Sequence, residues 1–263
     1  MQDYIEKTSC RVCKSENIKE VLDLNNQPLA NSYHKGESQK TFPLKLNLCH
    51  ECFHLQLSVV VNPNLMFEDY LYVSGTSKTL HQYFEDFVDI CENVGEGNKK
   101  ILDIACNDGT QLDKFKERGW ETYGICDYWS EEIAQNINNT FDVIVAQNVF
   151  AHVDDIHGFL KACSHVMDED GHLFVQTSQA NMIVNNEFDT IYHEHLSFFN
   201  ANSMKKCVNM NGFSLVDIFK TEIHGGSYVF VIKKGKHDES NATREISKEK
   251  SSGLYDLYTY DKY

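Results

Sequence analysis

Hydrophobic positions follow three different patterns along the 263 residues of the chain. Before residue 62 the apolar runs are short and interrupted by turn residues. All three prolines, Pro28, Pro43 and Pro63, lie in the first quarter of the chain. Over residues 64–94, apolar side chains recur mostly every three or four positions, which predicts helix with a break at 74–76. From residue 99, short apolar runs alternate with amphipathic segments, which is typical of strands alternating with helices.

This alternation predicts an α/β fold, in which helices cover a parallel sheet. The predicted strands span residues 99–105, 120–125, 141–149 and 171–178. The predicted helices span residues 108–119, 130–138, 154–167 and 203–210. Two further apolar runs, 213–223 and 226–235, predict an antiparallel pair at the end of the sheet. The polar segment from residue 236 has ambiguous helical potential.

The changes of pattern divide the chain into four expected parts. These are a small N-terminal domain, a helical connector, a core domain and a tail, at residues 1–62, 63–97, 98–235 and 236–263. The first boundary rests on Val61-Asn62-Pro63, after which the longer periodic segments begin.

The net charge narrows the class of partner. Asp and Glu number 39 against 24 Lys and Arg, a formal net charge of −15, and no run of basic residues forms a stripe. Such a field repels a phosphate backbone, so we expect no nucleic-acid partner. An anionic small molecule held by a few local donors remains compatible with this charge.

The N-terminal residues and the cysteines indicate the cellular compartment of the protein. The first ten residues lack a basic start and an apolar stretch, and no segment approaches the ~18 apolar residues of a membrane span. Nine cysteines are an odd number, and five of them are scattered without pattern, which fits a reducing compartment. We therefore expect a cytoplasmic protein without a membrane partner. Nothing in the sequence indicates an oligomeric state.

Four of the cysteines form two matched pairs. CRVC (Cys10, Cys13) and CHEC (Cys49, Cys52) each have C-x-x-C spacing, in which a tight turn brings two thiolates to one metal. The alternatives are unrelated buried thiols or a redox dithiol, but two such pairs in a part too small for a robust core favour Zn²⁺. Four thiolates leave no open position, so we expect a structural zinc whose chelation unfolds roughly the first 60 residues.

Residues 101–109, ILDIACNDG, form an apolar strand that runs into a turn before a helix. Ligands of α/β sheets bind at this carboxyl edge. The glycines of a phosphate-binding turn are depleted here, so the segment alone fits either a ligand loop or an ordinary turn. Asp108 at the start of the helix opposes a pyrophosphate and suits a cationic or neutral ligand such as S-adenosylmethionine (SAM), which argues against NAD.

These segments and six others, taken in order, resemble one family. They are CRVC, QPLANSY (27–33), FPL (42–44), CHEC, YLYVSGTS (70–77), DIACNDG (103–109), NVFAHVDD (148–155), YHEHLSFF (192–199) and HGGS (224–227). Across essentially the whole chain they look like the zinc-containing C-methyltransferases that act on nucleotide-linked keto-deoxysugars. The resemblance implies a class I SAM-methyltransferase core, a Rossmann-like α/β sheet, behind a small N-terminal zinc-binding domain.

The implied reaction moves a methyl group from SAM to a sugar carbon next to a keto group. That carbon is a poor nucleophile until its alpha proton is removed, so the site needs a general base and a donor for the enolate oxygen. By similarity to the family, His195 is the base, and Glu194 and Tyr192 orient or polarise the sugar. His152 is implied as a second polar contact. His193 of the same segment is expected to be structural.

The resemblance also implies the residues that bind SAM. They lie in or after the carboxyl-terminal parts of the first three strands of the core, or in the connector: Asp103, Asn107, Asp108, Gly109, Asp127, Gln147, Asn148, Ser74, Gly75 and Thr76.

Two departures from the family pattern bear on this function. Only about fifteen residues separate the strand at 120–125 from the strand at 141–149, room for a single helix, so one helix and one strand are missing. We expect the strand at 120–125 to form the sheet edge, one of two cofactor acids to be lost and SAM affinity to be weakened. The tail resembles the opening helix of a third domain that family members continue.

Three functions stay open at this point. The leading one is C-methyl transfer to a nucleotide sugar. The second is a family member with weakened or absent catalysis that acts as a binding or scaffold protein, which SAM binding without turnover would indicate. The third is O- or N-methyl transfer to another small molecule. The sugar, its ring carbon and the nucleotide are not indicated by the sequence.

Overall fold

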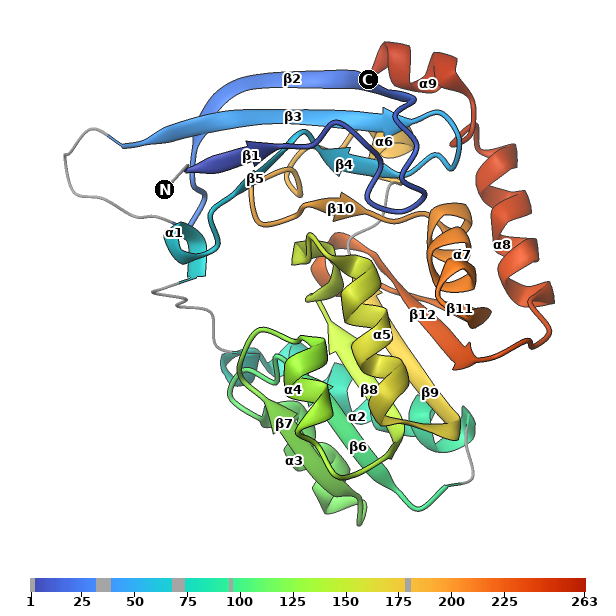
Figure 1. Ribbon diagram of the computed structural model, residues 1–263. Coiled ribbons are helices and arrows are strands. Elements are labelled where there is room, and N and C mark those ends of the chain that lie inside the picture. The colour runs from blue at the N-terminus through green and yellow to red at the C-terminus, as the bar shows by residue number, and fades with distance from the viewer. Residues whose placement is uncertain (1–2, 32–38, 68–73, 95–96, 178–180) are drawn as a thin grey trace.

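The computed structural model describes residues 3–31, 39–67, 74–94, 97–177 and 181–263, without the side chains of Phe67, Ser74 and His224. Figure 1 shows two parts packed on each other, with the N-terminal strands above and a larger sheet flanked by helices below. The end of the chain returns to the N-terminal strands, where the last helix lies.

A six-stranded sheet forms the larger part, in the order β11-β12-β9-β8-β6-β7. From one edge to the other the strands are β11 (Phe213–Thr221), β12 (Ser227–Lys234), β9 (Met167–Thr177), β8 (Phe141–Gln147), β6 (Lys100–Ile104) and β7 (Glu121–Ile125). The last four are mutually parallel, and β12 is antiparallel to both its neighbours. The expected α/β sheet with an antiparallel end is confirmed.

Helices cover both faces of this sheet because successive strand residues point to opposite sides. On one face, Ile101 and Val143 pack with Phe87 and Phe115, which lie on the helices α2 (Lys78–Val94) and α3 (Thr110–Glu117). The other face packs against α4 (Glu131–Gln135), α5 (Ile156–Val166) and α7 (Ala201–Met210). Among the described residues, no helix combines the length and the apolar content that crossing a membrane requires.

Strand β7 is the edge of the sheet. Within the described part of the chain it pairs only with β6. The short helix α4 is the one regular element between β7 and β8, and it packs against α5. The core is therefore as short at this edge as the residue count predicts, and no described strand pairs with the outer hydrogen-bonding groups of β7.

The N-terminal part is built on a second sheet, in the order β10-β4-β3-β2. Its strands are β2 (Ile18–Pro28), β3 (Thr41–Cys49), β4 (Leu55–Leu57) and β10 (Ser197–Phe198), and a separate ribbon pairs β1 (Tyr4–Glu6) with β5 (Val59–Val61). Strand β10 comes from far along the chain, so residues 1–62 do not complete their own sheet. The domain division at residue 62 stays a proposal.

Five short helical elements connect the longer ones within the described residues. Helix α1 (Asn64–Phe67) and the single turn η1 (Ser74–Thr76) precede α2, and α6 (Met182–Asn185) precedes β10. A further turn, η2 (Phe150–His152), follows β8, and η3 (Ile223–Gly225) joins β11 to β12. The expected break at 74–76 therefore coincides with η1.

The tail forms two helices, α8 (Ser240–Ser251) and α9 (Leu257–Lys262). Helix α8 packs against β11 and α7. Its Glu249 accepts hydrogen bonds from the backbone N–H of Ala201, the first residue of α7. Leu254 and Tyr260 are buried in the same hydrophobic cluster as Leu46 and Leu48 of β3. The tail thus ties the core to the N-terminal sheet.

Candidate functional site

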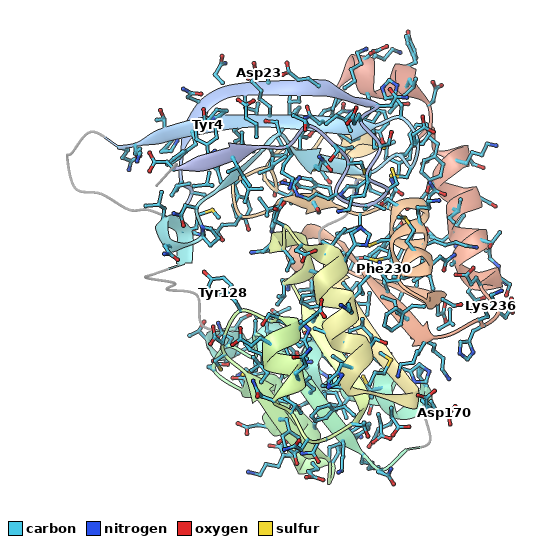
Figure 2. The ribbon with its side chains drawn as sticks, in the orientation of Figure 1. Tyr4, Asp23, Tyr128, Asp170, Phe230 and Lys236 are labelled. Carbon is cyan, nitrogen blue, oxygen red and sulfur yellow. The ribbon has the colours of Figure 1, made fainter. Side chains whose placement is uncertain are left out.

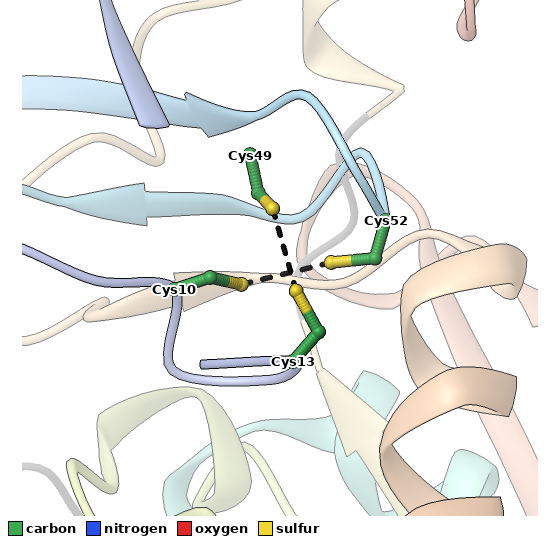
Figure 3. A group of neighbouring side chains, drawn as sticks. All are labelled: Cys10, Cys13, Cys49 and Cys52. Carbon is green, nitrogen blue, oxygen red and sulfur yellow. Dashed lines mark hydrogen bonds between the residues drawn. The ribbon is translucent and has the colours of Figure 1, made fainter. Parts of the chain in front are cut away.

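The four predicted metal ligands converge from two turns of the same shape (Figure 3). In the first turn, the N–H of Lys14 donates to the carbonyl of Cys10 (3.0 Å), and in the second the N–H of Phe53 donates to the carbonyl of Cys49 (2.9 Å). Lys14 and Phe53 both have left-handed backbones, with φ of 64° and 56°. Each turn therefore folds its C-x-x-C segment around one point.

The four sulfurs fit a single tetrahedral ion. Cys10 Sγ lies 3.6 Å from Cys52 Sγ, Cys13 Sγ lies 3.5 Å from Cys49 Sγ, and all four lie within 4.8 Å of one another. A zinc ion bonded to four thiolates at its usual bond length separates the sulfurs by about 3.8 Å. Three of the four cysteines are buried, and no open position remains for water or substrate. The site suits structural Zn²⁺.

The first metal turn is anchored in the core by Arg11, which is 1% exposed. Its Nε donates to Asp154 Oδ1 (3.0 Å) and its Nη1 donates to the carbonyl of Leu57 (2.9 Å). His157, on α5, contacts the carbonyl of Arg11 through Nε2 (3.1 Å). The metal centre therefore contacts the segment that follows β8 and leads into α5.

A row of polar side chains lies near the carboxyl ends of the central strands. These side chains are Asp103, Gln147 and Gln176. Each lies an even number of residues after an apolar strand residue that packs against α2, so all three point to the α2 face of the sheet. Gln147 and Gln176 are register partners on adjacent strands. Tyr83 of α2 donates to Gln176 Oε1 (2.6 Å).

The loop after β6 is held in an unusual backbone shape. Ala105, Asn107 and Gly109 all have positive φ, at 58°, 52° and 79°. Asp108 between them accepts hydrogen bonds from the N–H groups of Gly75 (2.7 Å) and Thr110 (3.1 Å). Burial acts to raise the pKa of Asp108, but these hydrogen bonds outweigh burial and lower it. Asp108 therefore stays charged and ties η1 to the loop.

Of the three connector residues that the resemblance implies as SAM contacts, Gly75 lies against the loop after β6. A Cβ on Gly75 would lie 2.6 Å from both Asp108 Oδ2 and Thr110 Oγ1, so a larger residue would displace these two side chains from their present positions. Thr76 is exposed in the same turn, and the Ser74 side chain lies outside the described residues. The structure brings η1 to the loop after β6, as the expected shared role of the two segments requires.

Two further implied residues follow β7 and β8. Asp127 is exposed just beyond β7, and its Oδ1 accepts a hydrogen bond from the N–H of Tyr128 (2.7 Å). Figure 2 shows Tyr128 at the side of the core that faces the N-terminal part. Asn148 has a left-handed backbone (φ 56°), and its N–H donates to the carbonyl of Gln176 (2.9 Å). Both residues lie at the carboxyl edge of the sheet.

The predicted base, His195, is oriented by two hydrogen bonds. Its Nδ1 lies 2.8 Å from the carbonyl of Thr190, and its Nε2 lies 3.0 Å from the hydroxyl of Tyr192. A carbonyl only accepts, so Nδ1 carries the hydrogen and Nε2 of the neutral ring is the acceptor. His195 is only 9% exposed. Its basic nitrogen is thus fixed in one direction, facing a phenol.

His152 lies next to this ring although it comes from a different part of the chain. The ring centroids of His152 and His195 are 5.0 Å apart in an edge-to-face arrangement. Burial, followed by the nearby His195, lowers the pKa of His152 to about 3. His152 is therefore neutral across the working range of pH.

The neighbours of His195 in YHEH have separate surroundings. Glu194 is buried, which raises its pKa, and its Oε1 accepts a hydrogen bond from Nδ2 of Asn31 (2.6 Å). His193 Nε2 lies 3.3 Å from the carbonyl of Phe42, and the two rings are in edge contact. His193 thus contacts β3, in line with the structural role expected of it, whereas Asn31 was not singled out from the sequence.

The N-terminal sheet places this histidine segment. Strand β10 pairs with β4, with Phe198 opposite Leu55, and the N–H of Leu57 donates to the carbonyl of Leu196 (3.0 Å). On the other side, Phe199 stacks on Phe150 of η2, with ring centroids 5.1 Å apart. His195 and His152 lie together because β10 pairs with β4 and Phe199 packs on Phe150.

Two family models match the chain. Residues 10–67 match the model described as "Putative zinc binding domain". Residues 78–218, more than half of the chain, match the model described as "Methyltransferase domain". The chain belongs to the methyltransferase domain family.

Individual relatives of this methyltransferase cover different shares of it. The C-methyltransferase NovU of Streptomyces niveus is 28% identical over 296 residues, covering 100% of this chain and 70% of NovU. The ubiquinone biosynthesis O-methyltransferase of Pseudomonas aeruginosa is 26% identical over 115 residues, 35% of this chain and 50% of that protein. A SAM-dependent methyltransferase structure from Clostridium acetobutylicum, 15% identical, has a TM-score of 0.46 over 59% of this chain and 92% of that one.

The protein is a SAM-dependent methyltransferase with a zinc-binding domain. The polar side chains of Asp103, Gln147 and Gln176 fit the methyl donor. Nε2 of Gln147 and Nε2 of Gln176 are buried without a hydrogen-bond partner among the described residues. Such orphaned donors are rare in folded proteins, and they suit the carboxylate of SAM. Burial raises the pKa of Asp103 to about 7, and a cationic ligand would favour its charged form.

Gln176 and Tyr83 were missed by the sequence reasoning. Gln176 is the polar residue at the end of GHLFVQT, in the same position on its strand as Gln147 on the neighbouring strand. A search for polar residues at each carboxyl strand end would have found it. Tyr83 carries no such signal, because an aromatic residue at helical spacing is usually part of the core.

Proposed function

We propose that this methyltransferase moves the methyl group of SAM to a carbon alpha to the keto group of a nucleotide-linked deoxysugar. The observation that carries the proposal is the fixed orientation of His195, whose basic Nε2 faces the Tyr192 hydroxyl. Carbon needs a base of this kind, whereas many oxygen and nitrogen nucleophiles need less activation. The name of NovU supports C-methylation, and the motif resemblance supports the sugar class.

The proposed roles follow from the hydrogen bonds of each group. When bound, SAM supplies an electrophilic methyl group. His195 accepts the alpha proton at Nε2, and the resulting imidazolium keeps its Nδ1–H on the Thr190 carbonyl. The Tyr192 hydroxyl donates to Nε2 before the substrate binds; the alpha C–H displaces it from Nε2, and the hydroxyl then donates to the enolate oxygen of the sugar.

His152 and Glu194 act as polar contacts in this proposal. His152 is neutral because its pKa is about 3, so it adds no positive charge beside His195 and leaves that ring able to accept a proton. Glu194, with its pKa raised by burial, is held by Asn31 next to the base. Its position suits a hydrogen bond to a sugar hydroxyl.

The experiment that tests this proposal identifies the substrate atom that is methylated. The full chain is incubated with SAM carrying a ¹³C methyl group and a nucleotide-linked keto-deoxysugar, and the product is examined by ¹H–¹³C correlation NMR. A carbon-bound methyl signal is expected. A methyl signal at the chemical shift of an O- or N-methyl group contradicts the proposal and favours the third function considered above. SAM binding without any product favours a scaffold role.

A further inference from the structure

We propose that Cys106 and Cys126 form a reversible disulfide site at the cofactor edge, which takes small disulfides of the glutathione class as co-reactant. This inference goes beyond the proposed methyl transfer. It concerns two cysteines that belong to neither the metal centre nor the histidine pair.

The two thiols are already in contact. Cys106 Sγ lies 3.0 Å from Cys126 Sγ. Their backbones are held side by side, because Ile104 and Ile125 are register partners on the parallel strands β6 and β7 and the N–H of Cys106 donates to the carbonyl of Ile125 (3.1 Å). A bridge between them therefore needs a small shift of the side chains and no rearrangement of the sheet.

Gly124 makes the space in which the Cys106 side chain lies. A Cβ built on Gly124 would be 2.6 Å from Cys106 Sγ and 3.2 Å from Cys106 Cβ. Any other residue at position 124 would push the thiol of Cys106 away from its present position. The same Cβ would lie 2.9 Å from Leu112 Cδ1 of α3, so Gly124 makes room for that side chain as well as for the thiol of Cys106.

Solvent exposure distinguishes Cys106 and Cys126 from the other cysteines. Cys126 is exposed and Cys106 is partly exposed, whereas the three remaining cysteines outside the metal centre are buried: Cys91, Cys163 and Cys207. Burial, followed by the neighbouring Cys126, raises the pKa of Cys106 to about 12. Cys126 is therefore the thiol that attacks first, and Cys106 is the resolving thiol.

The reaction balances as two thiol–disulfide exchanges. The Cys126 thiolate attacks one sulfur of glutathione disulfide, a mixed disulfide forms and one glutathione thiolate leaves. Cys106 loses its proton and attacks Cys126 Sγ, and the second glutathione leaves as a thiolate that takes up a proton. Two protein thiols are oxidised to one disulfide, and one glutathione disulfide is reduced to two glutathione molecules.

The bridge would act on the proposed cofactor site, and this part rests on the assignment of that site. Cys106 belongs to the loop with Asn107 and Asp108, and Cys126 directly precedes Asp127. Cys126 Sγ also contacts the carbonyl of Asn107 (3.7 Å). Bridging fixes the loop and the end of β7 in one relative position, so the two segments lose the freedom to adjust around SAM, and we expect the oxidised protein to bind SAM about tenfold more weakly.

The test uses the full, zinc-loaded chain equilibrated in buffers of reduced and oxidised glutathione. Free thiols are then alkylated, and a digest is analysed by mass spectrometry. A peptide pair linked through Cys106 and Cys126 is expected, and it should disappear on return to reduced glutathione. Cys126→Ser is the matched control, in which no linked pair forms. A chromophoric zinc chelator verifies that the metal thiolates stay bound.

Two results would overturn the site. One is the absence of the linked pair at an excess of oxidised glutathione in the folded, zinc-loaded protein. The other is a Cys126–glutathione adduct that persists without transfer to Cys106. Calorimetry of SAM binding to the reduced and bridged forms tests the coupling separately: equal affinities contradict it while leaving the bridge in place. If the reduced protein binds no SAM, the assignment of the cofactor site is contradicted. The presence or absence of the linked peptide pair still tests whether the disulfide forms.

Discussion

Arg11 of the first metal turn donates from Nε to Oδ1 of Asp154 over 3.0 Å, across 143 residues of sequence. The side chain of Arg11 is fully buried, and that of Asp154 is 32% exposed. Burial lowers the pKa of Arg11, and Asp154 is the charge that acts against this effect. The pair joins the zinc centre to the segment between His152 and α5.

Replacing Asp154 should therefore destabilise the whole chain. Asp154→Ala leaves the buried guanidinium without its carboxylate partner, and we expect a loss of about 3 kcal/mol in the free energy of unfolding. Urea denaturation measures this loss. Lys19→Ala is a matched control that removes the exposed pair between Lys19 and Asp261, both more than 60% exposed; it should cost less than about 1 kcal/mol. If both variants lose the same free energy of unfolding, the buried pair contributes no more to stability than the exposed pair, which contradicts the prediction.

Chelating the zinc should destabilise more than the N-terminal part. The sequence predicts unfolding of roughly the first 60 residues, but Cys10 and Cys52 share one hydrophobic cluster with Met204 and Cys207 of α7. We expect the main thermal transition to fall by about 10 °C, measured by circular dichroism, and to recover when zinc is returned. A core transition that is unchanged after verified zinc loss would show that the two parts unfold independently.

Stability should depend on pH through Asp103. Burial raises its pKa from 3.8 to about 7, so between these values the folded chain retains a proton that the unfolded chain has lost. Stability without SAM therefore falls as pH rises from about 4 to 7. Asp103→Asn should remove this part of the slope and stabilise the chain at pH 8, by urea denaturation. Asp113→Asn, at an exposed position of α3, is the control; an Asp103→Asn slope identical to wild type would contradict the assignment.

Asp103→Asn should also weaken SAM binding, although it stabilises the free protein. A cationic ligand favours the charged carboxylate, so wild-type affinity for SAM is expected to fall as pH drops below about 7. The variant should bind more weakly at pH 8 and lose this pH dependence. Calorimetric titration at pH 6 and pH 8 separates the two. Equal affinity of both proteins at pH 8 would exclude Asp103 from the cofactor site.

Local patterns predicted most of the core. Strand and helix periodicity located the six strands of the main sheet, because these residues pack on one or two faces along a regular repeat. The short edge at β7 followed from chain length alone. Both metal turns followed from C-x-x-C spacing, because the four ligands come from two tight local turns.

Contacts between distant segments were not predictable in the same way. Strand β10 has two residues and lies in the N-terminal sheet only because β4 leaves an open edge there. The role of Arg11 depends on Asp154, a pairing that leaves no periodic pattern in either segment. The resemblance named His195 and His152, but their contact arises from the packing of Phe199 on Phe150. Such placements are properties of the packed molecule.

The central claim, that His195 removes the alpha proton of the sugar, can be tested apart from methyl transfer. The chain is incubated in D₂O with a nucleotide-linked keto-deoxysugar and S-adenosylhomocysteine, and loss of the alpha-proton NMR signal is followed. Wild type and His237→Ala, an exposed histidine variant, should catalyse the exchange, and His195→Gln should be at least about 100-fold slower. Exchange by His195→Gln at the wild-type rate, or no exchange by the wild-type enzyme, would contradict the account.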